Sequence, residues 1–109
     1  MEAQTPREFI EKILPIKFKP EKASGIDVVV QLDLSGPESG SWSITVKNQK
    51  LQVTEGVVPS PSLSLKLSSI DFLDLVNGKI SAEKAFFTGK VQFKGKITDA
   101  LRLRDAGFF

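Results

Sequence analysis

The residues that could carry out acid–base or nucleophilic chemistry do not combine into a catalytic set. Asp71 and Asp74 are three residues apart on a predicted helix, a spacing that could present two carboxylates on one side for acid–base work. Near a helix start, carboxylates of this kind are typically solvated, and the helix dipole favours Asp71 there. Serine and threonine are plentiful, but no histidine is present to activate a hydroxyl nucleophile. We therefore predict that the protein is not an enzyme and has no catalytic residues.

Metal and cofactor chemistry is equally poorly represented. The sequence has neither Cys nor His, and its Asp and Glu residues do not cluster at metal-ligand spacing. Gly36 and Gly40 fall in a predicted hairpin, and Gly89 and Gly95 flank a predicted strand, so no phosphate-binding loop is formed. We therefore predict no metal and no cofactor. The absence of Cys fits a reducing compartment.

Composition indicates a soluble globular protein in which residues 1–109 form a single domain. Hydrophobic residues make up 40% and charged residues 26% of the sequence. No apolar run approaches the roughly 20 residues that a membrane span requires. The net charge is only +2, and the basic residues are scattered without interleaved aromatic residues. A nucleic-acid partner is therefore not expected.

Periodicity predicts an α+β fold. Apolar and polar residues alternate in five segments, which indicates strands with one apolar face each. Residues spaced three and four apart predict helices, the first capped by Thr5 and ended or kinked at Pro15. We expect a two-layer sandwich: a five-stranded, mostly antiparallel sheet with one solvated face and one face covered by about four to five helices. The predicted strands are 26–34, 42–46, 51–54, 62–67 and 90–94, and the predicted helices are 5–14, 71–76, 81–87 and 97–104.

Aromatic residues concentrate in the stretch from Ser69 to Gly95. It contains four of the eight phenylalanines, at positions 72, 86, 87 and 93. Phe86 and Phe87 lie about 100° apart on a helix, so one of the two rings needs a second apolar environment. They could form two faces of an ordinary core or the wall of a ligand cavity. Trp42 has the same two interpretations, a packed sheet residue or a cavity wall.

Two motifs in this stretch carry a resemblance to a known family. Asp71 to Lys79 reads D-F-L-x-L-x-x-G-K and Ala85 to Lys90 reads A-F-F-x-G-K, a combination that resembles the type 2 sterol carrier protein family. A weaker likeness continues upstream through W-x-x-x-x-K-N at Trp42 to Asn48, so the resemblance spans roughly residues 25 to 105. Ala82, Gln49 and the run 96–99 depart from the usual family pattern.

The resemblance implies a small, non-catalytic domain that binds and transfers lipid in an apolar tunnel between sheet and helices. The ligand could be a sterol, a fatty acid, an acyl-CoA or a similar apolar molecule. The alternative is an accessory or dimerisation domain with a filled core, derived from a larger enzyme. If the protein is a lipid carrier, we expect lipid contacts from aromatic and aliphatic residues of both layers: Trp42, Ile44, Phe72, Val76, Phe86, Phe87, Phe93, Ile97, Leu101, Leu103 and Phe108.

The end of the sequence gives two further expectations. Phe108 and Phe109 could close one mouth of the tunnel and swing out to a membrane, or could form a simple apolar plug on the core. Peroxisomal members of the family commonly end in a short targeting signal that Ala106 to Phe109 does not match, so we predict cytoplasmic localisation, with the peroxisome as the alternative. We also expect a monomer that makes transient contact with membranes.

Overall fold

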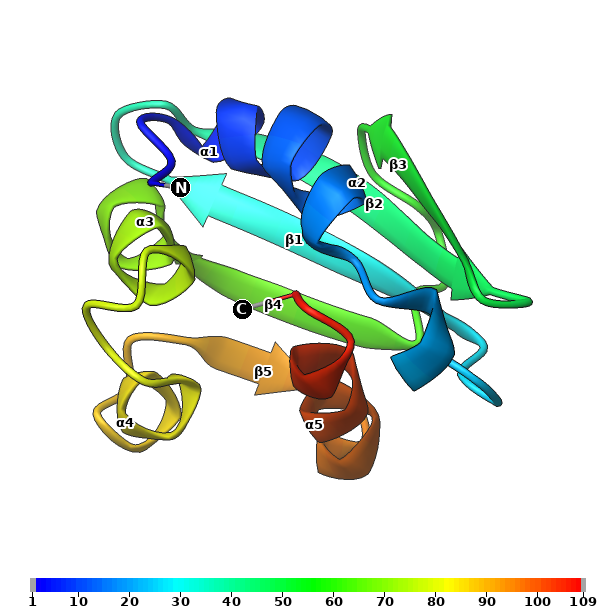
Figure 1. Cartoon of the computed structure of the whole chain (residues 1–109). Helices are drawn as coiled ribbons and strands as arrows, with labels where there is room; N and C mark the ends of the chain where they lie inside the picture. Colours follow the sequence, from blue (N-terminus) through cyan, green and yellow to red (C-terminus); the bar gives the residue numbers. More distant parts are fainter. Residues whose placement is uncertain (1, 109) are drawn as a thin grey trace.

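The five predicted strands form one sheet in the computed structural model, which describes residues 2–108 (Figure 1). The strand order is β3-β2-β1-β4-β5. Strands β1 and β4 are parallel, and the other three neighbouring pairs are antiparallel, as the prediction of a mostly antiparallel sheet requires. The strands are β1 (Val28–Ser35), β2 (Gly40–Lys47), β3 (Lys50–Glu55), β4 (Leu63–Ser68) and β5 (Gln92–Lys94).

Strand register places the apolar residues of all five strands on the same face. Leu32 of β1 is aligned with Trp42 of β2 and with Leu65 of β4, and Leu65 is aligned with Phe93 of β5. Because side chains alternate between the two faces of a strand, this alignment extends to every second residue. The result is a continuous apolar surface, and the helices pack on it (Figure 1).

The opposite face of the sheet is solvated only in part. Gln31 lies on this face and is only 3% exposed, because the connection from β3 to β4 crosses over it. Its side-chain oxygen accepts a hydrogen bond from the Val58 amide at 2.8 Å, and its side-chain nitrogen donates to the Gly56 carbonyl at 3.2 Å. These bonds satisfy a polar side chain that burial would otherwise destabilise.

The first helical segment is longer than predicted. It runs through α1 (Pro6–Glu8), the π-helix η1 (Phe9–Ile13) and α2 (Leu14–Lys17), after the expected cap by Thr5, whose hydroxyl accepts from the Glu8 amide at 3.1 Å. The sequence predicted that Pro15 ends or kinks this helix. An end at Pro15 is wrong, because the helical segment continues to Lys17. The wider π turn ends at Ile13, two residues before Pro15, which lacks an amide proton and crowds the preceding turn of a regular helix.

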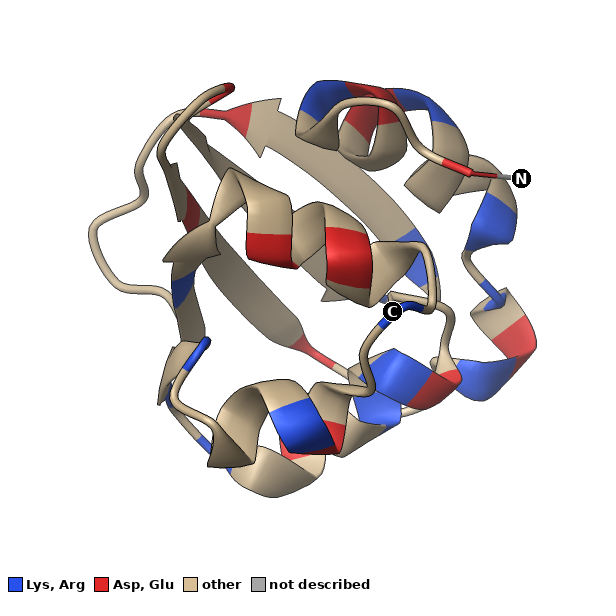
Figure 2. Ribbon diagram, turned by 90° about the vertical axis from the view of Figure 1, so that its left-hand side faces the viewer, with Lys and Arg blue, Asp and Glu red and all other residues tan. Residues whose placement is uncertain are grey.

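The remaining helices lie within two residues of their predicted bounds. They are α3 (Ser69–Val76), α4 (Ala82–Phe87) and α5 (Ile97–Asp105), with a single turn of 3-10 helix, η2 (Pro20–Lys22), after α2. Ser68 caps α3 and Ser81 caps α4, each accepting a backbone amide hydrogen bond. Figure 2 marks acidic positions along α3 and both acidic and basic positions along α4. Among residues 2–108, none of the helices has the length and apolar character to cross a membrane.

The C-terminal segment is packed against the end of α2. Gly107 has a φ of +105°, and a Cβ atom at this position would lie 2.6 Å from the Lys17 carbonyl oxygen, so only glycine fits. The Lys19 amide donates to the Ala106 carbonyl at 2.8 Å. These contacts fix the position of Phe108, which is buried in the core.

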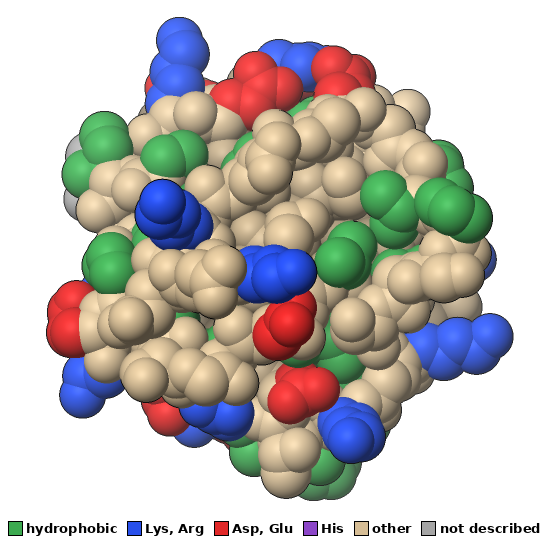
Figure 3. Space-filling view, turned by 90° about the vertical axis from the view of Figure 1, so that its right-hand side faces the viewer, with side chains coloured by type: hydrophobic (Ala, Val, Ile, Leu, Met, Phe, Trp, Pro, Cys, Tyr) green, Lys and Arg blue, Asp and Glu red, His purple; other side chains and the backbone are tan. Residues whose placement is uncertain are grey.

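Surface charge is mixed. On the face nearest β3, shown in Figure 3, basic and acidic side chains are interspersed with small groups of hydrophobic side chains. No large field of a single sign is visible on this face, which agrees with the low net charge of +2.

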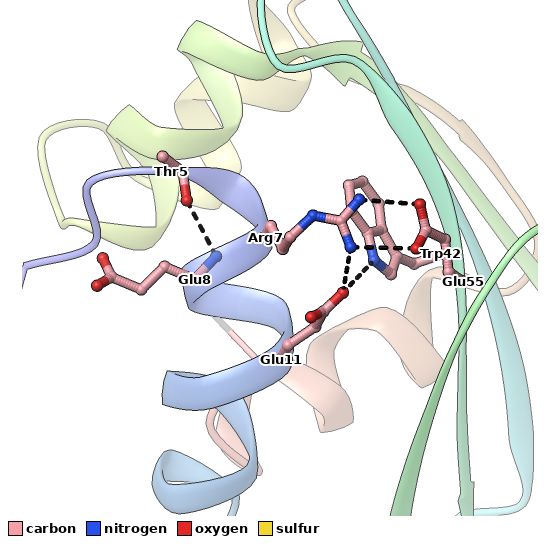
Figure 4. Close-up of polar contacts among 6 residues, drawn as sticks. All are labelled: Thr5, Arg7, Glu8, Glu11, Trp42 and Glu55. Atoms are coloured by element: carbon pink, nitrogen blue, oxygen red, sulfur yellow. Dashed lines mark hydrogen bonds and ion pairs between the residues drawn. The ribbon is translucent and has the colours of Figure 1, made fainter.

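A polar cluster joins α1 to the β2–β3 edge of the sheet (Figure 4). The Arg7 guanidinium makes two hydrogen bonds to the Glu55 carboxylate, at 2.9 and 3.1 Å, and one to Glu11 at 2.7 Å. It also lies 5.4 Å from the centre of the Trp42 ring, whose indole nitrogen donates to Glu11 at 3.3 Å. The bidentate hydrogen bond and the positive charge of Arg7 hold the pKa of Glu55 below its ordinary value.

This pKa shift predicts a pH dependence of stability. Because the pKa of Glu55 is lower in the folded protein, ionised Glu55 stabilises the fold above its unfolded pKa of about 4.3, and this stabilisation is lost as the pH falls through the folded pKa. We expect Glu55→Gln to lose less stability than wild type on acidification, measured as the free energy of unfolding in urea over a pH series. In an Arg7→Gln background the same substitution should change that slope little. Identical slopes for wild type and Glu55→Gln would contradict the assignment.

Candidate functional site

A cavity of about 270 Å³ lies between the sheet and the last three helices. Its floor is the apolar face of β4 and β5 with one residue of β1, and its walls come from α3, α4 and α5. Figure 1 shows α4 and α5 at the β5 side of the sheet, with α3 next to α4. The lining residues are Leu32, Leu65, Leu67, Phe72, Leu75, Ala82, Glu83, Phe86, Phe87, Val91, Phe93, Ile97, Ala100 and Leu101.

The cavity is lined by buried residues on its inner side and by exposed residues on its outer side. Leu32, Leu67 and Phe72 belong to the buried core and form its inner end. At the outer end, Phe87 is 84% exposed, and Phe86, Ile97 and Leu101 are also exposed. Large exposed apolar side chains are scattered singly on most protein surfaces. Here four of them line the same cavity, which indicates a binding site for an apolar molecule.

Helix α4 has very little core of its own. Ala85 is its one buried residue, so Phe86 and Phe87 are not two faces of an ordinary core. Both rings line the cavity. Phe86 makes edge-to-face contacts with Phe87 at 5.8 Å and with Phe93 at 6.3 Å, measured between ring centres. The aromatic residues of the motif A-F-F-x-G-K therefore form one side of the opening.

Local sequence positions α4 over the cavity. The helix begins at the Ser81 cap and is flanked by Gly78 and Gly89, each with a φ of +78°. These glycines let the chain reverse direction on both sides of a helix of six residues. Two ion pairs then tie the region to its neighbours: Lys90 with Asp71 of α3 at 3.5 Å, and Glu83 with Arg104 of α5.

The cavity wall offers almost no reactive chemistry. Among its lining residues within the described part of the chain, only Glu83 has an ionisable side chain. Across residues 2–108, no group of three His, Cys, Asp or Glu side chains is placed to hold a metal ion. What this arrangement can do is remove apolar surface of a ligand from water, a favourable process that needs no reactive group.

Six of the eleven residues predicted to contact lipid line this cavity. They are Phe72, Phe86, Phe87, Phe93, Ile97 and Leu101. Ile44 and Phe108 instead line a separate small space of about 20 Å³ in the core, which shares Leu32, Leu65 and Phe72 with the larger cavity. Trp42, Val76 and Leu103 line neither space. Trp42 is buried beneath Arg7, so the packed-sheet interpretation holds for it.

The sequence prediction missed part of the cavity wall. Leu32, Leu65 and Leu67 lie on the apolar face that the alternation identified, but the strand order was needed to place β4 between β1 and β5 and so to bring these residues to the cavity. Leu75 and Val91 were assigned to their elements without a role in binding. Ala82 and Ala100 are small residues at which the helices leave room, and small residues give no signal in a search for aromatic residues.

Phe108 does not lie at the opening. It is 5% exposed and packs inside the core, and its amide donates to the Leu103 carbonyl at 3.1 Å. This position matches a plug on the core. The other half of the predicted gate, Phe109, lies outside the described residues.

Comparison with known proteins gives a consistent result. The family model described as "SCP-2 sterol transfer family" matches residues 10–106. "Hydroxysteroid dehydrogenase-like protein 2" of Xenopus laevis is 33% identical over 101 residues, which cover 91% of this chain and 24% of that protein. "Oleate-induced peroxisomal protein POX18" of Candida maltosa is 31% identical over 88 residues, covering 77% of this chain and 69% of that protein.

Solved structures show the same fold. The apo form of "Sterol Carrier Protein 2" from Yarrowia lipolytica has a TM-score of 0.66 and 27% sequence identity, covering 94% of this chain and 87% of that one. The chain thus matches almost the whole of this small relative, whereas it spans about a quarter of the length of the Xenopus laevis protein.

Two phenylalanine substitutions separate the cavity opening from the core. Phe87→Ala should cost less than about 1 kcal/mol of stability, because most of the ring is already in water, but should weaken binding of an apolar fluorescent probe. Phe9→Ala should cost about 3–5 kcal/mol, because that ring is buried and packs edge-to-face on Phe72. Denaturant unfolding and probe titration measure the two effects. Equal stability losses would contradict the assignment of Phe87 to the opening.

Proposed function

Since the chain belongs to the SCP-2 sterol transfer family, we propose that its cavity holds one lipid molecule and that the domain carries this lipid between sites. The observation that supports the proposal most strongly is the lining of the cavity, which is apolar except for Glu83. An apolar ligand that enters it leaves water, and each buried methylene group contributes about 0.8 kcal/mol.

The wall chemistry supports a defined orientation for the ligand. An uncompensated polar group inside an apolar cavity costs several kcal/mol, and the inner wall offers no hydrogen-bonding side chain. The polar end of a lipid is therefore best placed at the opening, with its apolar part inside. A volume of about 270 Å³ is near the lower end of the range of about 300–1,000 Å³ for drug-sized ligands, which favours a slim ligand in this conformation.

The domain itself is proposed to be non-catalytic. The lining residues include a single carboxylate and no nucleophile with an adjacent base, so binding is the activity that the site supports. Six residues from the sequence prediction are the proposed lipid contacts, together with the leucines of β1 and β4 that form the floor.

Partners and localisation complete the proposal. A monomer whose exposed Phe87 and Ile97 touch a lipid surface would bring the opening against the source of its ligand. Cytoplasmic localisation stays a prediction. The Candida maltosa relative, named as a peroxisomal protein, supports the alternative.

A second candidate function is that of an accessory domain within a larger protein. The length of the Xenopus laevis relative, of which this chain matches 24%, favours it. The sequence analysis predicted a filled core for such an accessory domain. The cavity between the sheet and the last three helices argues against a filled core. An accessory domain with a lipid-binding cavity would present the ligand to a neighbouring domain.

Displacement of a fluorescent fatty acid from delipidated protein tests the carrier function. With saturated fatty acids of increasing length, affinity should rise about fourfold per methylene group until the cavity is full. Ala100→Phe, which fills the cavity, should abolish binding while the protein stays folded. Thr98→Phe, on the same helix but outside the lining, is the matched control and should bind normally. Absence of displacement at any chain length would favour the filled-core alternative.

A further inference from the structure

An ion pair joins the two helices at the open end of the cavity. Glu83 of α4 is part of the cavity lining, and its carboxylate accepts a hydrogen bond from the Arg104 guanidinium of α5. A second carboxylate, that of Asp105, lies 3.6 Å from the Nε atom of Arg104. Figure 2 shows charged residues of both signs on α4 and on the neighbouring helix.

Helical spacing places Arg104 in line with the cavity wall. Arg104 follows Ile97, Ala100 and Leu101 by seven, four and three residues, and residues at these spacings share one face of a helix. Those three residues line the cavity. Arg104 therefore continues the same stripe at the C-terminal end of α5, and its contact with Glu83 places the guanidinium at the edge of the cavity.

The guanidinium group matches the head group of an anionic lipid. Arginine presents a planar fork of N–H donors that binds carboxylate and phosphate groups, often through two hydrogen bonds. Glu83 itself presents a carboxylate at the end of a short aliphatic chain, the same chemistry as the end of a fatty acid. The pair is partly solvated, with side-chain exposures of 37% for Arg104 and 55% for Glu83. An exposed pair of this kind is weak, so a ligand can replace it at little cost.

We propose that Arg104 is the recognition site for the anionic head group of a single-chain lipid, and that Glu83 occupies this site until the ligand displaces it. The proposal rests on the lipid-carrier function and adds the class of ligand: amphiphiles with one alkyl chain and a carboxylate or phosphate head. On binding, the head group takes the place of the Glu83 carboxylate on Arg104, and Glu83 turns into solvent.

Neighbouring basic residues are less suited to this role. Arg102 donates a hydrogen bond to the Ser24 carbonyl at 2.6 Å, which holds its guanidinium against the loop before β1. Lys90 pairs with Asp71. Lys84 is next to Glu83 in sequence but is not part of the cavity lining, so it provides a matched control for the loss of one positive charge on this surface.

The test uses three ligands with the same ten-carbon chain: decanoate, decyl phosphate and decanol. Their affinities are measured by calorimetry for wild type, Arg104→Gln, Glu83→Gln and Lys84→Gln at a pH at which both acids are ionised. Arg104→Gln should weaken binding of the preferred anion about tenfold and leave decanol within about twofold. Glu83→Gln should strengthen anion binding about two- to fivefold relative to decanol binding. Lys84→Gln should change neither.

Each outcome is decisive. The anion whose affinity depends most on Arg104 identifies the head group as a carboxylate or a phosphate. If Arg104→Gln weakens all three ligands equally, or none of them, the head-group site is overturned while the carrier function stands on decanol binding. If none of the three binds wild type, the carrier function itself fails. If Arg104→Gln lowers the melting temperature, Glu83→Gln, which keeps Arg104, provides the test instead. Stronger anion binding by this variant then supports the head-group site, and unchanged anion binding overturns it.

Discussion

The structure depends on one constraint: the sheet presents a continuous apolar face that must be kept from water. Register makes this unavoidable, since the same alternation runs through all five strands and the aligned residues match. Over β1 and β2 the constraint is met by close packing. The helical segment from Pro6 to Lys17, the edge-to-face pair of Phe9 and Phe72, and Phe108 fill that half of the sandwich.

Over β4 and β5 the same constraint is met less completely. Helix α4 has only six residues and one buried side chain, and Ala82 and Ala100 leave room where larger residues would meet. An empty apolar space is unfavourable because its lining atoms lack partners for dispersion contacts. The Ser81 cap and the glycine turns position α4, and the hydrogen bond from Arg102 to the Ser24 carbonyl positions α5. None of these contacts requires the space to be filled. A ligand that fills the cavity supplies the missing contacts, so the apolar surface that destabilises the empty protein is also the source of affinity.

The sequence predicted whatever depends on local chemistry. Alternation identified the strands, and Ser81 and Thr5 marked helix starts, because these signals lie within a few residues. The sequence did not distinguish the closely packed part of the apolar face, over β1 and β2, from the part over β4 and β5 that lines the cavity. Trp42 and Leu65 carry the same alternation signal, and only the strand order shows that Leu65 lies beside β5 whereas Trp42 lies beside β3. The parallel pairing of β1 with β4 leaves no mark in either strand, since alternation is identical in parallel and antiparallel sheets.

Contacts between distant segments were equally invisible. Gln31 lies on the face of the sheet that was predicted to be solvated, yet the connection to β4 buries it through hydrogen bonds to Gly56 and Val58. The pair of Glu83 and Arg104 spans 21 residues and joins two helices whose relative position the sequence does not give.

The inner end of the cavity links the two halves of the core. Leu32, Leu65 and Phe72 line both the cavity and the small space that contains Phe108. The two spaces are thus separated by side chains alone, with no strand or helix between them. Side chains change rotamer far more readily than a sheet changes register. A lipid chain longer than the present cavity can therefore be accommodated by rotation of these three side chains, with the backbone in place. Such rotation would let the cavity take ligands of different length while the sheet and the helix caps stay unchanged.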